Sequence, residues 1–156
     1  MALMKKELFM IQLLFIGLLT AGCLAAQAVP VCMAVTEDDA RAVIGSTAKR
    51  SKDPSGCGWE DAGHKTRMNI ARIGVVSMFE RARTGTAAEG KNQTETGLGG
   101  TAFSTIPTAH HGERAAIYVL GASSVLVVDI DGFAAGGAEQ RLPQMRDLAR
   151  KLVPKL

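Results

Sequence analysis

The sequence predicts an α+β domain, a mainly antiparallel sheet of about five strands with helices packed against it, in the order α-β-β-α-β-β-β-α. Two observations support this prediction. Residues 114–120 and 123–130 are nearly continuous apolar runs separated only by Gly121-Ala122, which indicates central strands joined by a tight turn. Residues 139–153 instead repeat apolar side chains at helical spacing and place basic side chains on the other faces.

The first element is predicted to be a short helix that begins after Thr36. The Thr36 side chain can cap this helix, and Asp39, three residues later, can complete a capping box. Gly45 supplies the C-terminal stop. The predicted buried stripe follows helical spacing and consists of Ala40, Val43 and Ile44.

A loop and a β-hairpin are predicted next. Residues 46–56 are polar and basic, which is typical of a loop, and strands are predicted at residues 57–60 and from about 66 to 76. The apolar side chains of the second strand fall on two faces, Met68 and Ile70 on one and Ile73 and Val75 on the other. We therefore expect a bulge near Ala71-Arg72 that brings them to one face.

A second helix is predicted to open at Ser77, with Glu80 placed for a capping box and a buried patch of Met78, Phe79 and Ala82. Residues 85–100 are rich in Gly, Thr, Asn, Gln and Glu and are predicted to form a mobile loop over a site. Within them, Gly97-Leu98-Gly99-Gly100 predicts a turn of unusual backbone angles. A phosphate-binding loop is not favoured, because a strand at residues 101–106 follows where a helix would be needed.

The N-terminal residues have the order of a secretory signal peptide. Lys5 and Lys6 precede the apolar run of residues 8–19, and small residues follow, ending in Ala26-Gln27-Ala28. We therefore expect the protein to work outside the cytoplasm. Removal of residues 1–28 leaves 128 of the 156 residues, enough for a single α+β domain at residues 29–156.

The fate of this leader has three alternatives. Thr20-Ala21-Gly22-Cys23 resembles a lipobox, in which the Cys becomes the acylated first residue of a bacterial lipoprotein. The uncharged stretch of residues 8–26 also approaches the roughly 20 residues that a membrane-spanning helix needs. Cleavage after Ala28, lipidation at Cys23 and retention as an uncleaved anchor therefore remain open. Each places the rest of the chain on the far side of the membrane, as a periplasmic, secreted or lipid-anchored protein.

The composition limits the classes of partner. The formal net charge of +3 falls to +2 without residues 1–28, which contain two Lys and one Glu. Such a mild charge indicates neither nucleic-acid binding nor strong attraction to an anionic membrane, so membrane contact is expected only through a lipid anchor or an uncleaved leader. Aromatic residues make up 4% of the chain, which argues against an aromatic-lined sugar or peptide cleft.

Two cysteines remain after the leader, Cys32 and Cys57. An even number of cysteines in an oxidising compartment favours a disulfide. It would close a loop of about 25 residues and stabilise the fold by roughly 3–4 kcal/mol on the chain-entropy model. A metal or redox pair is less favoured, because the two are far apart in sequence and form no C-x-x-C motif.

The other polar motifs of the chain give little support to metal binding or catalysis. With His64, the adjacent His110 and His111 could hold zinc or copper, but neighbouring side chains on an extended segment point to opposite faces and no metal-ligand spacing is present. The segment from Asp129 to Gly132 lacks the further ligands of a calcium loop and is predicted to be a strand end followed by a turn. No nucleophile occurs with a base, so neither catalysis nor a cofactor is expected.

The order of several short motifs resembles small exported bacterial lipoproteins of unknown function. The motifs are Cys32, Val35-Thr36 with Ala40 and Ile44-Gly45, then Cys57-Gly58-Trp59, then Gly97-Leu98-Gly99-Gly100-Thr101-Ala102. The resemblance implies an α+β domain, a Cys32–Cys57 disulfide and no established activity. It carries over no catalytic residue.

The expected function is therefore that of an exported, non-enzymatic binding or accessory domain of the cell envelope. Its partner would be a small ligand or an envelope protein. The alternative is a periplasmic metal-binding or hydrolytic protein that uses His64, His110 and His111.

Overall fold

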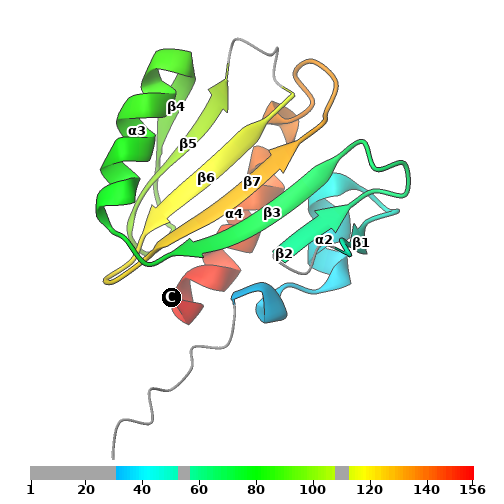
Figure 1. Cartoon of the computed structure of the whole chain (residues 1–156), viewed down its shortest axis with the longest axis horizontal. Coiled ribbons are helices and arrows are strands. Elements are labelled where there is room, and N and C mark those ends of the chain that lie inside the picture. Colours follow the sequence, from blue (N-terminus) through cyan, green and yellow to red (C-terminus); the bar gives the residue numbers. More distant parts are fainter. Residues whose placement is uncertain (1–30, 53–56, 108–112) are drawn as a thin grey trace, which may run out of the picture.

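The computed structural model describes residues 31–52, 57–107 and 113–156, apart from the side chains of Glu89 and Pro107. It has the predicted α+β class, with a seven-stranded antiparallel sheet in the order β1-β2-β3-β7-β6-β5-β4 (Figure 1). The strands are β1 (Lys49–Arg50), β2 (Cys57–Glu60), β3 (Arg67–Ile73), β4 (Gly90–Glu95), β5 (Thr101–Pro107), β6 (Ala115–Leu120) and β7 (Val125–Asp131). The helices are α2 (Glu37–Ile44), α3 (Ser77–Glu89) and α4 (Leu142–Leu152), with the 3₁₀ helices η1 (Val31–Ala34), η2 (Glu139–Arg141) and η3 (Val153–Lys155).

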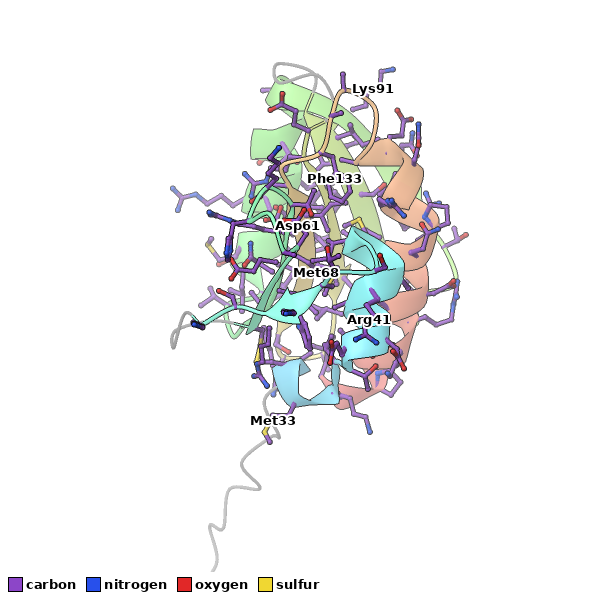
Figure 2. All side chains as sticks on the ribbon, turned by 90° about the vertical axis from the view of Figure 1, so that its right-hand side faces the viewer. Met33, Arg41, Asp61, Met68, Lys91 and Phe133 are labelled. Atoms are coloured by element: carbon purple, nitrogen blue, oxygen red, sulfur yellow. A yellow bond between two sulfur atoms is a disulfide. The ribbon has the colours of Figure 1, made fainter. Side chains whose placement is uncertain are left out.

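The helices lie on both faces of the sheet. Figure 2 shows α2 and α4 on one side and α3 on the other. The α2–α4 side encloses the main core, whose side chains come from alternate positions of the strands, among them Met68, Ile117, Leu126, Val128 and Ile130. None of the helices in the described part of the chain is long and apolar enough to span a membrane.

The predicted capping box of the first helix is present at α2. The Asp39 backbone N–H donates to Thr36 Oγ1 over 3.2 Å, and the Thr36 backbone N–H donates to Asp39 Oδ2 over 2.7 Å. The same Asp39 oxygen accepts a bond from Lys151 Nζ of α4 at 2.5 Å. Asp39 therefore both starts α2 and ties it to α4, in addition to the apolar stripe that α2 buries.

Beneath α3 lies a second, smaller core. Phe79 packs edge-on against Phe103 with their ring centroids 5.2 Å apart, and Phe103 stacks on Tyr118 at 4.7 Å. Phe79 is buried as predicted, whereas Met78 is exposed. The predicted Ser77–Glu80 capping box was wrong, because Ser77 is already helical and Glu80 pairs with Arg83 instead.

The sheet has two more strands than the expected five, both in segments predicted to be loops. β1 pairs with β2 at one edge, and β4 pairs with β5 along six residues at the other. Residues 85–100 are thus the end of α3, then β4, and only then a turn. These edge strands have weak intrinsic preference for strand structure, and pairing with a neighbour overrides it.

The predicted bulge in the second strand of the hairpin was also wrong. β3 pairs with β7 without interruption from Arg67 opposite Asp131 to Ile73 opposite Val125. Ile73 points to the α3 side and packs against the second core. Because the sheet carries an apolar core on each face, the change of face in the sequence needs no bulge.

The glycine-rich turn before β5 has the predicted unusual backbone. Gly97 and Gly99 have φ angles of 73° and 77°, in the left-handed region that favours glycine. At Gly100 a Cβ atom would lie 2.5 Å from the carbonyl oxygen of Leu120, so the close approach of the two strands requires glycine. Leu98, between these glycines, is buried in the main core.

Cys32 and Cys57 form the predicted disulfide, with their Cα atoms 5.0 Å apart. It joins η1 to the start of β2, where Cys57 lies opposite Ile70 of β3. The first segment of the described chain is thereby fixed to the sheet.

Candidate functional site

One face of the sheet is only partly covered. α3 packs on β4, β5 and β6, and in Figure 1 it lies in front of the left-hand part of the sheet while no ribbon lies in front of β3 and β7. The strand register places a row of mostly polar side chains on this uncovered part. We call it the open face; it consists of Gly58, Glu60, Arg67, Asn69, Arg114, Tyr118, Asp129 and Asp131.

Asp129 is the most deeply placed charged group of the open face. It lies in the central strand β7 and is only 9% exposed. Arg114 Nε donates to Asp129 Oδ1 over 2.8 Å, and the Asn69 side chain donates a further hydrogen bond. Burial raises the pKa of Asp129, and the bonds from Arg114 and Asn69 only partly offset that effect.

The Asp129 carboxylate shifts the pKa of two neighbouring side chains, Arg114 and Tyr118. The hydrogen bond and charge of Asp129 raise the pKa of Arg114, whose side chain remains more than half exposed. Burial and the Asp129 charge also raise the pKa of the Tyr118 hydroxyl. Tyr118 therefore joins the polar open face to the aromatic stack beneath α3.

Next to Asp129 the open face forms a shallow polar hollow of about 300 Å³. Its lining residues are Ser51, Gly58, Trp59, Glu60, Arg67, Asn69 and Asp131. A Cβ atom at Gly58 would lie 3.3 Å from both Asn69 Oδ1 and Ser51 Cβ. A side chain at this position would therefore take up space in the hollow. Arg67 and Asp131 face each other in the register of β3 and β7. The hollow thus offers a guanidinium, carboxylates and an amide to a polar ligand.

Of the three histidines of the predicted metal site, His64 lies within the described residues. His64 lies in the turn between β2 and β3, mostly exposed, with its Nδ1 3.0 Å from Glu60 Oε2. His110, His111, Cys23 and the leader lie outside the described residues. Across residues 31–52, 57–107 and 113–156, no three His, Cys, Asp or Glu side chains form a group that could hold a metal ion.

From the sequence, Asp129 is expected only as the end of a strand followed by a turn, because the calcium motif that it would open is incomplete. The available signal was an aspartate inside a run of buried apolar residues, where a charge is unfavourable without partners. Its partners could not be found from sequence, because Asn69 and Arg114 reach it only through the pairing of β3, β7 and β6.

Comparisons of the chain with models of known protein families, with curated proteins and with solved structures find no match.

Proposed function

We propose that this chain is an exported cell-envelope protein whose single domain, residues 29–156, binds a small ligand or a protein partner at the open face without catalysing a reaction. The observation that carries the proposal is Asp129, a carboxylate held almost buried on a face that no described helix covers. Burying a charge lowers stability unless it is well paired. Groups that a protein retains at such a cost to stability are concentrated at functional sites.

Export is supported by two independent features. The first 28 residues have the charged, apolar and small-residue order of a signal peptide. The Cys32–Cys57 disulfide is of the kind that persists in oxidising compartments. The chain would then be a free protein beginning at Val29, a lipoprotein anchored at Cys23, in keeping with its resemblance to small exported lipoproteins, or a protein anchored by its uncleaved leader.

Binding is favoured over catalysis by the way Asp129 is held. A general base must present a free lone pair to the proton that it removes. Asp129 already accepts bonds from Arg114 and Asn69, which fixes the guanidinium of Arg114 on the surface. This arrangement orients groups for recognition, and Arg67 beside it adds a second exposed guanidinium.

The alternative, a metal-binding or hydrolytic protein, draws on His64, because Glu60 next to it lines the hollow. Its test is the triple substitution of His64, His110 and His111 by alanine. If the metal content of the purified protein is unchanged, the alternative is excluded.

The proposed binding face is tested by photo-crosslinking in the cells that make the protein. Benzoylphenylalanine replaces Arg67 on the open face or, as the control, Arg41, which lies on α2 on the far side of the sheet (Figure 2). We expect a covalent adduct, detected by intact mass, from position 67 and not from position 41. The same adducts at both positions, or none at position 67, would exclude the open face as the binding surface.

Asp129→Asn separates a binding role of Asp129 from a structural one. Because burial raises the pKa of Asp129, the charged carboxylate lowers the stability of the fold increasingly as the pH rises above the usual aspartate value of 3.8. At pH 7 the free energy of unfolding of the variant should therefore equal that of the wild type or exceed it by about 1 kcal/mol. This increase in the free energy of unfolding should vanish at acidic pH, where the Asp129 carboxyl of the wild type is protonated in both the folded and the unfolded state.

Denaturant unfolding measures this change, and the position-67 adduct should be lost in the same variant. Asp147→Asn is the matched control, since Asp147 is exposed and pairs with Arg150 on α4; it should change neither measurement. A loss of several kcal/mol in Asp129→Asn with the adduct intact would make Asp129 a structural residue.

A further inference from the structure

Exposed large apolar side chains gather at one end of the domain. Among the described residues, those with the greatest exposure are Met33 at 68%, Val75 at 55%, Val76 at 41% and Met78 at 38%. Three of the four lie within four residues, Val75 and Val76 in the segment that joins β3 to α3 and Met78 in the first turn of α3. We call these four side chains the apolar end.

Several contacts place this segment beside both the first and the last described residues. Arg72, near the end of β3, donates from Nη2 to the Leu156 backbone oxygen over 2.8 Å and from Nε to Ser124 Oγ over 3.1 Å. η1 packs against β3, to which the disulfide also holds it through β2. In Figure 1, η1, the C-terminus and the β3–α3 connection all lie along the lower edge, and Figure 2 shows Met33 at that end and Lys91 at the opposite one.

The leader joins the domain at the same end. Val31, the first described residue, follows Cys23 by eight residues, which span at most about 28 Å when fully extended. If Cys23 carries the lipid, or if the leader stays in the membrane, no other part of the domain is tied so closely to the bilayer. The exposed apolar side chains thus occur where a short tether would hold the protein against lipid.

We propose that the apolar end rests on the phospholipid bilayer that the leader enters, with Val75, Val76 and Met78 in the headgroup region. The proposal rests on the exported, anchored form of the proposed function, with Cys23 lipidated or the leader retained, and it adds contact by the domain itself to anchoring by the leader. Transfer of apolar side chains from water to the interface supplies the attraction. The mild net charge predicts little dependence on anionic lipid or salt.

This orientation leaves the binding face free. In Figure 1 the strands run obliquely upward from the apolar end. The open face therefore lies along the side of the domain and not at the apolar end. A ligand or partner would therefore reach Asp129 and Arg67 alongside the membrane rather than through it.

Tryptophan fluorescence of the full-length chain tests the proposal. The chain has one tryptophan, the buried Trp59, which gives the same background in every variant. A reporter is introduced by Val76→Trp and, as the control at the opposite end, by Lys91→Trp. With vesicles of phosphatidylethanolamine and phosphatidylglycerol brominated in their acyl chains, the Val76→Trp emission should shift to shorter wavelength and be quenched. Lys91→Trp should show neither change.

A second variant tests whether the apolar side chains themselves make the contact. Met33→Trp should be quenched by the same vesicles, and its quenching should decrease when Val75, Val76 and Met78 are all replaced by serine. These residues are exposed, so the midpoint of denaturant unfolding should stay close to that of the Met33→Trp protein. Equal quenching of Val76→Trp and Lys91→Trp, or none at Val76→Trp, overturns the proposal and leaves the crosslinking test of the open face unaffected.

Discussion

Replacing both Cys32 and Cys57 by serine is expected to lower the free energy of unfolding by about 3–4 kcal/mol. The disulfide joins residues separated by 25 positions, so its loss allows the unfolded chain many more conformations. It also releases η1 from β2 and with it Val31, which is buried in the main core. Guanidinium unfolding of the wild type and the double variant measures the difference.

Reductant provides the matched control for this prediction. Dithiothreitol should destabilise the wild type by a similar amount and leave the double variant unchanged. A difference below about 1 kcal/mol, within what an ordinary surface substitution produces, would contradict the stabilising role of the disulfide.

Glu95→Ala is expected to lower the free energy of unfolding by about 2–3 kcal/mol, because it leaves a partly buried arginine without its partner. Glu95 lies at the end of the edge strand β4 and is buried. It accepts two hydrogen bonds from Arg146 of α4, at 2.6 and 2.8 Å, and one from Ser104 of β5 at 2.7 Å. The carboxylate thus joins β4, β5 and α4, and its removal should loosen this edge of the sheet. Thermal and denaturant unfolding measure the loss.

The pH dependence gives Glu95→Ala a distinct signature. Burial raises the pKa of Glu95, but the hydrogen bonds from Arg146 and Ser104 and the charge of Arg146 outweigh it and hold the pKa below its usual value of 4.5. The contribution of Glu95 is therefore complete above about pH 4.5 and is lost as the pH falls through the folded value. The difference in the free energy of unfolding between the wild type and Glu95→Ala should therefore become smaller at acidic pH.

Glu37→Ala is the control for the ion pair. Glu37 pairs with Arg41 at 2.6 Å, a distance as short as that between Glu95 and Arg146. Unlike Glu95, however, Glu37 is about half exposed, and so is Arg41. Exposed pairs of this kind contribute less than about 0.5 kcal/mol. Equal losses in the two variants would show that the burial of Glu95 does not matter.

The parts of the fold that local chemistry determines were predictable from the sequence. The Thr36–Asp39 capping box depends on residues three apart, and the apolar run of β7 identifies a central strand in any arrangement. The disulfide followed from the even number of cysteines left after the leader.

What the sequence did not show depends on pairing between distant segments. β4 is polar and contains glycine, and it becomes a strand because β5 offers six residues of pairing and Arg146 holds its last residue. Ile73 suggested a bulge because a core on both faces was not expected. The open face could not be predicted from the sequence either, because its side chains are brought together by the pairing of β2, β3, β6 and β7.

The roles proposed for the open face and the apolar end both require the claim that the domain lies outside the cytoplasm with Cys32 and Cys57 oxidised. Intact mass analysis of the native protein, with and without reductant, tests this claim most directly. We expect a chain that begins at Val29, at Cys23 with added acyl groups, or at Met1 with the leader retained, and that gains about 2 Da on reduction as the disulfide opens. A mass that is unchanged by reductant would contradict the claim, whichever residue the chain begins at.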